Sequence, residues 1–216
     1  MNHKLCLTHS SMTDSSPVPT TTNTVADNNL APFNPSSETA QRQSLALMRL
    51  QPHDVLLDLG CGDGRLLIKA VSEFAGLRCV GIEMDPVFYQ RAIQAAATQL
   101  SVEAQRRLQI RCQDATQVLA APAPSAVLRT DGSKTTNNSM DDLTIFDATV
   151  LYLYLLPRGL AQIQGLLDKL VQHRLARGLS LRVVAYTFRV KAWEPTAIDT
   201  STKSGVPIYL YEFGLN

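Results

Sequence analysis

Residues 55–64 read Val-Leu-Leu-Asp-Leu-Gly-Cys-Gly-Asp-Gly, an apolar run of strand length that leads directly into a glycine-rich turn. Residues 65–74 then show the apolar spacing of a helix. A glycine-rich turn between a strand and a helix lets backbone N–H groups approach a ligand closely, because glycine has no Cβ atom and tolerates positive φ. This stretch therefore predicts a ligand-binding unit at the start of an α/β domain.

The segments on either side continue the alternation of strands and helices. Short apolar runs predict further strands at residues 79–83, 108–112, 149–154, 181–188 and 208–213. Helical spacing with suitable end signals predicts helices at residues 37–50, 85–100 and 157–175. Strands that alternate with helices pair in parallel through right-handed crossovers. The expected fold class is α/β, with helices on both faces of a mostly parallel sheet.

Composition narrows the class of protein and its partners. The chain has 216 residues, of which 45% are hydrophobic and 18% charged, so one domain with an ordinary core is expected. Its 20 Lys and Arg against 19 Asp and Glu give a net charge of +1, which does not favour a nucleic-acid partner. No apolar run approaches the ~18 to 20 residues that a membrane-spanning helix needs.

Two polar segments are expected to lie outside the folded core. Residues 1–31 are rich in Ser, Thr, Asn and Pro and predict a disordered tail, and residues 121–142 predict a flexible surface insertion. A single folded domain would then span residues 32–216. The four cysteines include no CxxC pair, which favours a reducing, intracellular setting, cytoplasmic or mitochondrial.

The glycine turn departs from the patterns that bind phosphate. A dinucleotide-binding turn has the spacing G-x-G-x-x-G, but Gly60, Gly62 and Gly64 place the third glycine one position early, and Arg65 stands in its place. No lysine follows the last glycine, as a phosphate-binding P-loop requires. Asp58 ends an otherwise apolar strand, where an unpaired charge is costly. The turn therefore favours a ligand with an ammonium group over a pyrophosphate.

Two further carboxylates fall at the ends of neighbouring strands. Glu83 ends the next predicted strand, about 20 residues after the glycine turn, where a carboxylate can accept both hydroxyls of a ribose. Asp114 follows the third strand, at the same edge of the sheet, and could bind an adenine amino group. Sites for an amino acid, a ribose and an adenine in this order describe S-adenosylmethionine. Asp63 has two readings, as a cap of the next helix or as a contact to the amino group of the cofactor.

The same residues resemble a known family. Residues 58–64 resemble motif I of class I S-adenosylmethionine-dependent methyltransferases, and residues 80–86, Val-Gly-Ile-Glu-Met-Asp-Pro, resemble their second motif. The chain is most similar to a subgroup whose eukaryotic members methylate lysines of the mitochondrial ATP synthase c-subunit and adenine nucleotide translocase, and which has bacterial relatives. The segments that carry this likeness are Pro-Phe-Asn-Pro-Ser at 32–36, Ala-Thr-Val-Leu-Tyr-Leu-Tyr-Leu-Leu-Pro at 148–157, Phe188 with Trp-Glu-Pro at 193–195, and Ile-Tyr-Leu at 208–210. The chain departs from the eukaryotic members because it has no membrane-anchoring segment.

The resemblance implies a Rossmann-like sheet of seven strands, or slightly fewer, with the last strand antiparallel. It implies S-adenosyl-L-methionine as the cofactor, no metal, and a protein substrate with a target lysine. The residues expected to bind the cofactor are Asp58, Gly60, Cys61, Gly62, Asp63, Glu83, Met84, Gln113, Asp114 and Ala115.

Aromatic residues are the candidates for the methyl-transfer step. Methylases that modify amino groups of nucleic-acid bases carry Asn/Asp-Pro-Pro-Tyr after the fourth strand, where this chain has Tyr-Leu-Leu-Pro at 154–157. Tyr154 is therefore the first candidate for a residue beside the transferring methyl group, and Tyr152 and Trp193 are the others. Aromatic rings can desolvate a lysine while tolerating a cation. Core packing is the alternative role for each of these residues.

The sequence favours a protein-lysine N-methyltransferase that transfers the methyl group directly in line. One alternative keeps the cofactor and changes the acceptor to a small molecule or a nucleic-acid base. Another is a catalytically inactive module that only binds S-adenosylmethionine.

Overall fold

The structure is a computed structural model that describes residues 30, 33–120, 140, 143–202 and 205–214. The predicted tail and the predicted insertion lie outside the described residues, apart from Leu30 and Met140. The strands are β1 (Val55–Leu59), β2 (Arg78–Glu83), β3 (Leu108–Cys112), β4 (Val150–Leu153), β5 (Leu181–Tyr186), β6 (Ala197–Asp199) and β7 (Ile208–Phe213). The helices are α1 (Glu38–Met48), α2 (Arg65–Glu73), α3 (Pro86–Gln99), α4 (Val102–Gln105), α5 (Ala115–Ala120) and α6 (Pro157–Leu175), with a 3₁₀ turn η2 (Ile145–Asp147).

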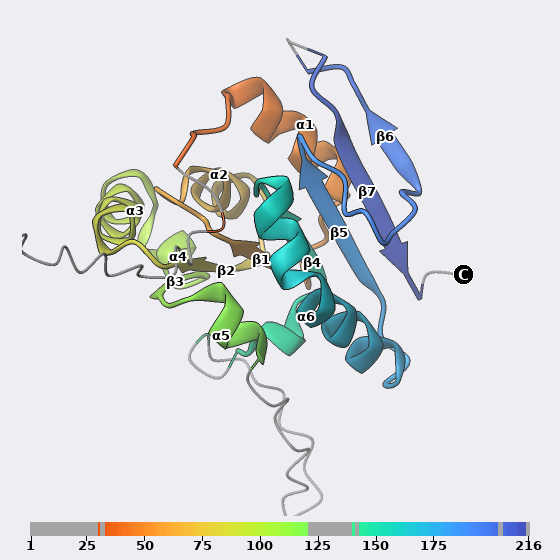
Figure 1. Ribbon diagram of the computed structural model, residues 1–216. Helices are drawn as coiled ribbons and strands as arrows, with labels where there is room; N and C mark the ends of the chain where they lie inside the picture. Colours follow the sequence, from red (N-terminus) through yellow and green to blue (C-terminus); the bar gives the residue numbers. More distant parts are fainter. Residues whose placement is uncertain (1–29, 31–32, 121–139, 141–142, 203–204, 215–216) are drawn as a thin grey trace, which may run out of the picture.

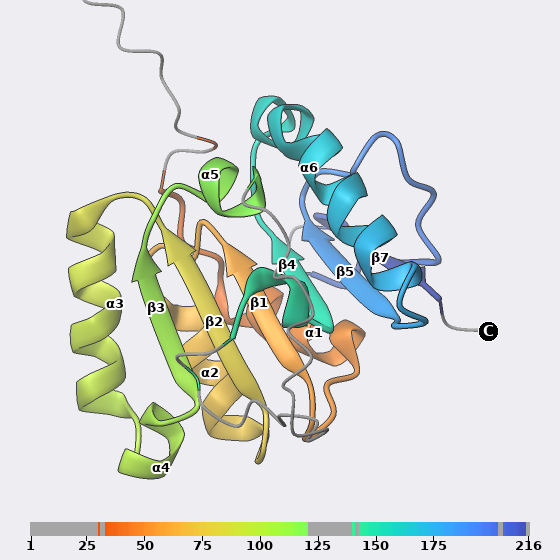
Figure 2. The ribbon, with the colours of Figure 1, turned by 90° about the horizontal axis from the view of Figure 1, so that it is seen from below.

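The strands form one seven-stranded sheet in the order β3-β2-β1-β4-β5-β7-β6 (Figure 1). The first five strands pair in parallel, so their carboxyl ends meet at one edge of the sheet (Figure 2). The last strand, β7, lies between β5 and β6 and is antiparallel to both. The predicted Rossmann-like α/β fold with an antiparallel last strand is confirmed.

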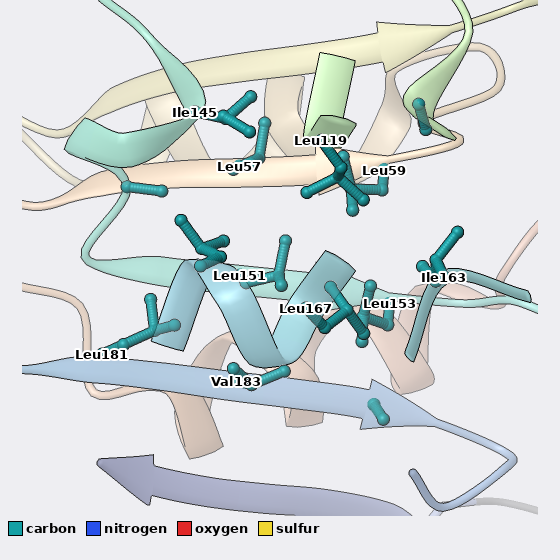
Figure 3. Packing of buried hydrophobic residues seen from close by; sticks show 14 of the residues in the cluster. Leu57, Leu59, Leu119, Ile145, Leu151, Leu153, Ile163, Leu167, Leu181 and Val183 are labelled. Carbon is teal, nitrogen blue, oxygen red and sulfur yellow. The ribbon is translucent and has the colours of Figure 1, made fainter. Parts of the chain in front are cut away.

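Helices cover both faces of the sheet because its central strands are apolar on both sides. Leu56 of β1 and Val150 of β4 belong to the core shared with α1, α2 and α3. The neighbouring residues Leu57 and Leu151 point to the other face, where they pack with Leu167 of α6 (Figure 3). At about 1.5 to 3 kcal/mol for each large apolar side chain fully buried, these two layers supply most of the stability of the fold.

Three polar side chains tie the strands together at the amino edge of the sheet, away from the glycine turn. Asp54, which precedes β1, is 2% exposed. Its carboxylate pairs with Arg182 of β5 at 2.5 Å and accepts a hydrogen bond from the Thr149 hydroxyl at 2.6 Å. Burial acts to raise the pKa of Asp54, but the bonds from Thr149, Arg182 and the Gln51 amide outweigh it and lower that pKa. The ionised carboxylate therefore stabilises this edge.

The structure differs from the predicted elements mainly at their ends. The predicted strand at 181–188 ends at Tyr186, because Thr187 has a φ of 76° and cannot continue an extended strand. The strand predicted at 149–154 covers only Val150–Leu153, so Tyr154 lies just beyond it. The short elements α4, α5 and β6 were not predicted, because each has too few residues for a periodic pattern.

Candidate functional site

A cleft of about 610 Å³ opens at the carboxyl edge of the parallel strands. Residues after β1, β2 and β3 form one wall, and residues from the ends of β4 and β5 form the other. The segment before α1 contacts both walls, because Phe33 packs against Gly62 and Asn34 bonds Tyr154. All of the sequence-predicted site residues line this cleft except Trp193. The topology alone explains the grouping, because parallel strands end at a common edge where ligands bind.

The glycine turn lies against the end of β2. The Gly60 and Cys61 amides both donate to the Ile82 carbonyl, at 2.8 and 3.0 Å, and the Gly62 amide donates to Glu83 Oε2 at 2.7 Å. Gly62 has a φ of 57°, and a Cβ atom on it would lie 2.8 Å from the Phe33 ring. Glycine is therefore required here both by the backbone conformation and by the close packing of the segment before α1.

Asp58 is a buried carboxylate at the base of the cleft. Its side chain is 4% exposed, and it lies on β1 with Gly81 of β2 on one side and Tyr152 of β4 on the other. Burial raises the pKa of Asp58 to about 8, and the nearby charge of Glu83 adds to the effect. A buried carboxyl group without a cationic partner is the kind of group that a bound ammonium would stabilise.

Glu83 and Asp114 extend the acidic wall along β2 and β3. Glu83 Oε1 accepts a hydrogen bond from the Asp85 amide at 2.8 Å, so together with the Gly62 contact its carboxylate has a fixed orientation. Asp114 Oδ1 accepts from the Thr116 amide and hydroxyl at 2.8 and 2.7 Å, at the start of α5. Each carboxylate still has lone pairs to offer a ligand, because ionised carboxylates have about four acceptor sites.

Asp63 is engaged by its neighbour Arg65. The guanidinium donates to both Asp63 oxygens, with Nε to Oδ1 at 2.9 Å and Nη2 to Oδ2 at 2.5 Å. Burial acts to raise the pKa of Asp63, but the hydrogen bonds and charge of Arg65 outweigh it and lower that pKa. The N-cap of α2 is Gly64 and no side chain caps it, so the predicted role of Asp63 as a helix cap is wrong. The pair with Arg65 still lines the cleft, and a contact of Asp63 with the cofactor stays a prediction.

Cys61 is unsuited to nucleophilic chemistry. It is 8% exposed, and its pKa is raised well above the usual value by burial and by the charges of Asp58 and Glu83. A thiol that stays protonated is a poor nucleophile. A Cβ atom on Gly81 would lie 2.7 Å from the Cys61 sulfur, so this side chain packs tightly against β2.

Tyr154 and Tyr152 lie on the opposite wall in different environments. Tyr154 is partly exposed in the cleft, and its ring packs against the Tyr186 ring with centroids 4.7 Å apart. The pKa of Tyr154 is raised, chiefly by burial and further by Tyr186, with the Thr187 side chain opposing the shift. Its hydroxyl therefore stays protonated near neutral pH and can serve as a hydrogen-bonding group but not as a base.

Tyr152 is 3% exposed. Its hydroxyl, like that of Ser44, has no hydrogen-bond partner among the residues that the structure describes. Burial raises the pKa of Tyr152 well above its usual value and Asp58 adds to the shift; the Ser44 hydroxyl, which is near but not in hydrogen-bonding geometry, opposes it. The ring of Tyr152 is part of the core shared with α1 and α2, which agrees with the packing role, and the side chain also reaches the base of the cleft. A role of Tyr152 in methyl transfer stays a prediction.

Trp193 lies away from the cleft. It is 9% exposed, and its indole N–H donates to Asp168 Oδ1 of α6 at 2.8 Å. Its ring meets the edges of Tyr211 and Phe213 with centroids 5.5 and 4.9 Å apart. This placement favours the packing role for Trp193 over a role at the substrate.

Sequence reasoning did not single out three residues that the fold brings to the cleft. Asn34 Nδ2 donates to the Tyr154 hydroxyl oxygen at 2.9 Å, across 120 residues of sequence. Phe33 stacks on Phe88 of α3 with ring centroids 4.0 Å apart. Thr187 follows β5 in a left-handed conformation that is rare for a threonine. The proline-flanked segment at 32–36 was the available signal for the first two, and no sequence signal marks Thr187.

Within the described ranges, no three His, Cys, Asp or Glu side chains gather as metal ligands. None of the helices in the described part of the chain has the length and hydropathy needed to cross a bilayer.

Comparisons with known proteins agree with the fold. A curated protein-lysine N-methyltransferase from Saccharolobus islandicus (strain REY15A) is 24% identical over 185 residues, which are 85% of this chain and 94% of that protein. An RNA methyltransferase from Salinibacter ruber, solved in complex with S-adenosyl-L-homocysteine, superposes with a TM-score of 0.60 and 24% identity over 85% of this chain and 95% of that one. The yhhF protein of Escherichia coli superposes with a TM-score of 0.50 and 17% identity over 86% of this chain and 91% of that one. No protein-family model matches the chain. The chain therefore has the Rossmann-like fold of class I methyltransferases.

Proposed function

We propose that this protein is an S-adenosylmethionine-dependent methyltransferase and that its acceptor is a lysine side chain of a protein. The observation that carries the cofactor assignment is the row of carboxylates at the ends of β1, β2 and β3, with a buried Asp58 that has no positive partner among the described residues. The lysine assignment is supported by the similarity to the Saccharolobus protein-lysine N-methyltransferase and by the tyrosines of the opposite wall.

The three carboxylates of the acidic wall follow one another in the same order as the amino group, the ribose and the adenine of the cofactor. Asp58 would face the amino group, Glu83 the ribose hydroxyls, and Asp114 the adenine amino group. The glycine turn leaves room beside them, because Gly60 and Gly62 have no side chains. Met84, which is 40% exposed beside Glu83, would cover a face of the adenine. When bound, this cofactor supplies an electrophilic methyl group on a sulfonium.

The protein then has to orient an amine and exclude water from it. A lysine with a pKa near 10.4 is neutral in only about one molecule in a thousand at pH 7.4, which corresponds to roughly 4 kcal/mol. The aromatic wall lowers that cost by desolvating the amine. Tyr154 would contact the amine, and Tyr152 would shape the base of the cleft beneath it.

Isothermal titration with S-adenosylhomocysteine tests the cofactor assignment. Wild-type protein should bind, and Asp58→Ala or Glu83→Ala should weaken binding strongly, whereas Glu73→Ala on the exposed face of α2 should not. Unchanged affinity in both cleft variants would contradict the assignment.

Transfer of a labelled methyl group to a cell extract tests the acceptor. Label that is released by protease and recovered as methyl-lysine supports the proposal. Label that is released by nuclease would instead favour a nucleic-acid acceptor, the alternative prompted by the RNA methyltransferase with the same fold. Cofactor binding without transfer to any fraction would favour the inactive binding module.

A further inference from the structure

The wall opposite the carboxylates contains an amide paired with a phenol. Asn34 and Tyr154 both line the cleft, and the Asn34 amide donates its hydrogen to the Tyr154 oxygen at 2.9 Å. The two residues lie 120 positions apart in the sequence, one before α1 and the other just after β4. Their contact is therefore a tertiary feature of this fold.

Asn34 is fixed in place by its neighbours on both sides. Before it, Phe33 stacks on Phe88 and lies against Gly62 of the glycine turn. After it, the Ser36 carbonyl accepts a hydrogen bond from the Gln41 side chain at 2.9 Å, and Ser37 caps α1. The amide is therefore preorganised at the rim of the cleft, although its own side chain is exposed.

The pairing leaves two oxygen atoms available in the cleft. Because the Asn34 nitrogen points to Tyr154, the Asn34 carbonyl oxygen is directed elsewhere, and it accepts no hydrogen bond from the described residues. The Tyr154 oxygen receives one bond from Asn34, and its second lone pair faces the Thr187 side chain, so an incoming N–H group would have to displace or share that contact. Neither residue carries a charge, so the pair offers acceptors without the cost of burying an ion.

We propose that Asn34 and Tyr154 together form the binding site for the acceptor nitrogen, and that Asn34 makes the cleft selective for an amine. This inference rests on the proposed methyltransferase function. A neutral primary amine has two N–H bonds to donate and one lone pair that must remain free to attack. Two oxygen acceptors hold the N–H bonds and leave the lone pair directed at the methyl group. As the nitrogen–carbon bond forms and the carbon–sulfur bond breaks, positive charge moves to nitrogen, where the same oxygens stabilise it until a proton leaves to water.

The inference can be tested without knowing the protein substrate. The probe is an analogue of S-adenosylhomocysteine in which nitrogen replaces sulfur and carries a 2-aminoethyl arm, which places an amine on the acceptor side. A matched probe carries a propyl arm of the same length. The measured quantity is the ratio of the two dissociation constants, obtained by isothermal titration, with S-adenosylhomocysteine as a third ligand that reports the cofactor site alone.

Asn34→Leu should reduce the preference for the amine arm about tenfold or more, because losing one hydrogen bond to a charged group weakens binding by about that factor. Asn34→Asp should increase the preference, since a carboxylate attracts the ammonium. Gln164→Leu removes an amide on α6 that bonds Asp168, outside the cleft, and should change nothing. S-adenosylhomocysteine should bind all four proteins equally.

Three results would overturn the inference. The first is an amine preference in Asn34→Leu within about twofold of wild type. The second is an equal loss of S-adenosylhomocysteine affinity, which would assign Asn34 to the cofactor. The third is a fall in the preference in Asn34→Asp. Failure of wild-type protein to bind S-adenosylhomocysteine would instead reject the proposed function, and this inference with it.

Discussion

The two walls of the cleft are built from opposite halves of the sheet and differ in chemistry. The wall from β1, β2 and β3 has carboxylates at successive strand ends, Asp58, Glu83 and Asp114. The wall from β4 and β5 has uncharged groups, chiefly Tyr152, Tyr154 and the approaching Asn34. The first wall suits a cationic ligand rich in hydroxyls, and the second suits a neutral amine that becomes charged during transfer. The division implies that donor binding and acceptor binding can be altered separately.

The largest effect should come from a substitution at the amino edge of the sheet, where Asp54 beside β1 pairs with Arg182 of β5 and so joins the two halves of the sheet. Asp54→Ala removes the partner of Arg182, whose side chain is only 13% exposed, and should lower the free energy of unfolding by about 3 kcal/mol. Denaturant unfolding measures the loss. Glu194→Ala, which breaks an exposed pair with Arg189, should cost less than about 0.5 kcal/mol. If both variants lost the same free energy of unfolding, the buried Asp54–Arg182 pair would contribute no more to stability than an exposed ion pair.

Glu83→Ala should weaken only the binding of the methyl donor, at the wall from β1, β2 and β3, which we call the donor wall. The variant loses the contacts of its carboxylate with Gly62 and Asp85 as well as the proposed ribose contacts, so S-adenosylhomocysteine should bind about 100-fold more weakly. Binding of the amine arm relative to the propyl arm should not change. A change in that ratio would mean that the two walls are coupled.

The pH dependence of S-adenosylhomocysteine binding tests whether Asp58 pairs with the amino group of the ligand. Because the pKa of Asp58 is about 8, its carboxyl group is mostly protonated below that pH and must lose a proton to pair with an ammonium. Affinity for S-adenosylhomocysteine should therefore rise as pH increases toward 8, by up to about tenfold per pH unit. Titrations at several pH values measure the slope, and Asp58→Asn should abolish it.

The raised pKa of Asp58 also predicts that the stability of the folded protein falls as pH rises, whereas ligand affinity increases. The folded protein retains a proton on Asp58 at pH values where the unfolded chain, with an ordinary pKa of 3.8, has lost it. The stability due to this group is therefore complete below about pH 4 and is lost as pH rises toward 8. Asp58→Asn should unfold with a weaker pH dependence over that range.

Tyr154→Phe should have the smallest effect. The effect should be confined to the wall from β4 and β5, which we call the acceptor wall because it would bind the methyl acceptor. The substitution removes a hydroxyl but keeps the ring against Tyr186, so turnover should fall about tenfold while S-adenosylhomocysteine affinity stays the same. Single-turnover methyl transfer and titration measure the two quantities. A matching loss of cofactor affinity would place this residue on the donor side.

The donor wall was easier to predict from sequence than the acceptor wall. Asp58 and Glu83 each end an apolar strand, so local pattern and parallel topology were enough to place them at one edge. Their ligand contacts stay predictions. Asn34 reaches Tyr154 only through packing of Phe33 on the glycine turn, and no local pattern encodes that contact. Trp193 was a candidate as an aromatic residue in a segment that resembles the family, but its contact with Asp168 depends on how α6 lies over the sheet.

The hydrogen bonding of the glycine turn limits how this cleft could be redesigned. Three consecutive amides, those of Gly60, Cys61 and Gly62, are already committed to the Ile82 carbonyl and the Glu83 carboxylate. A loop that grips a diphosphate must present such amides to the ligand. Restoring the glycine spacing of a dehydrogenase would therefore not convert this protein to nicotinamide chemistry, since the turn would first have to be detached from β2.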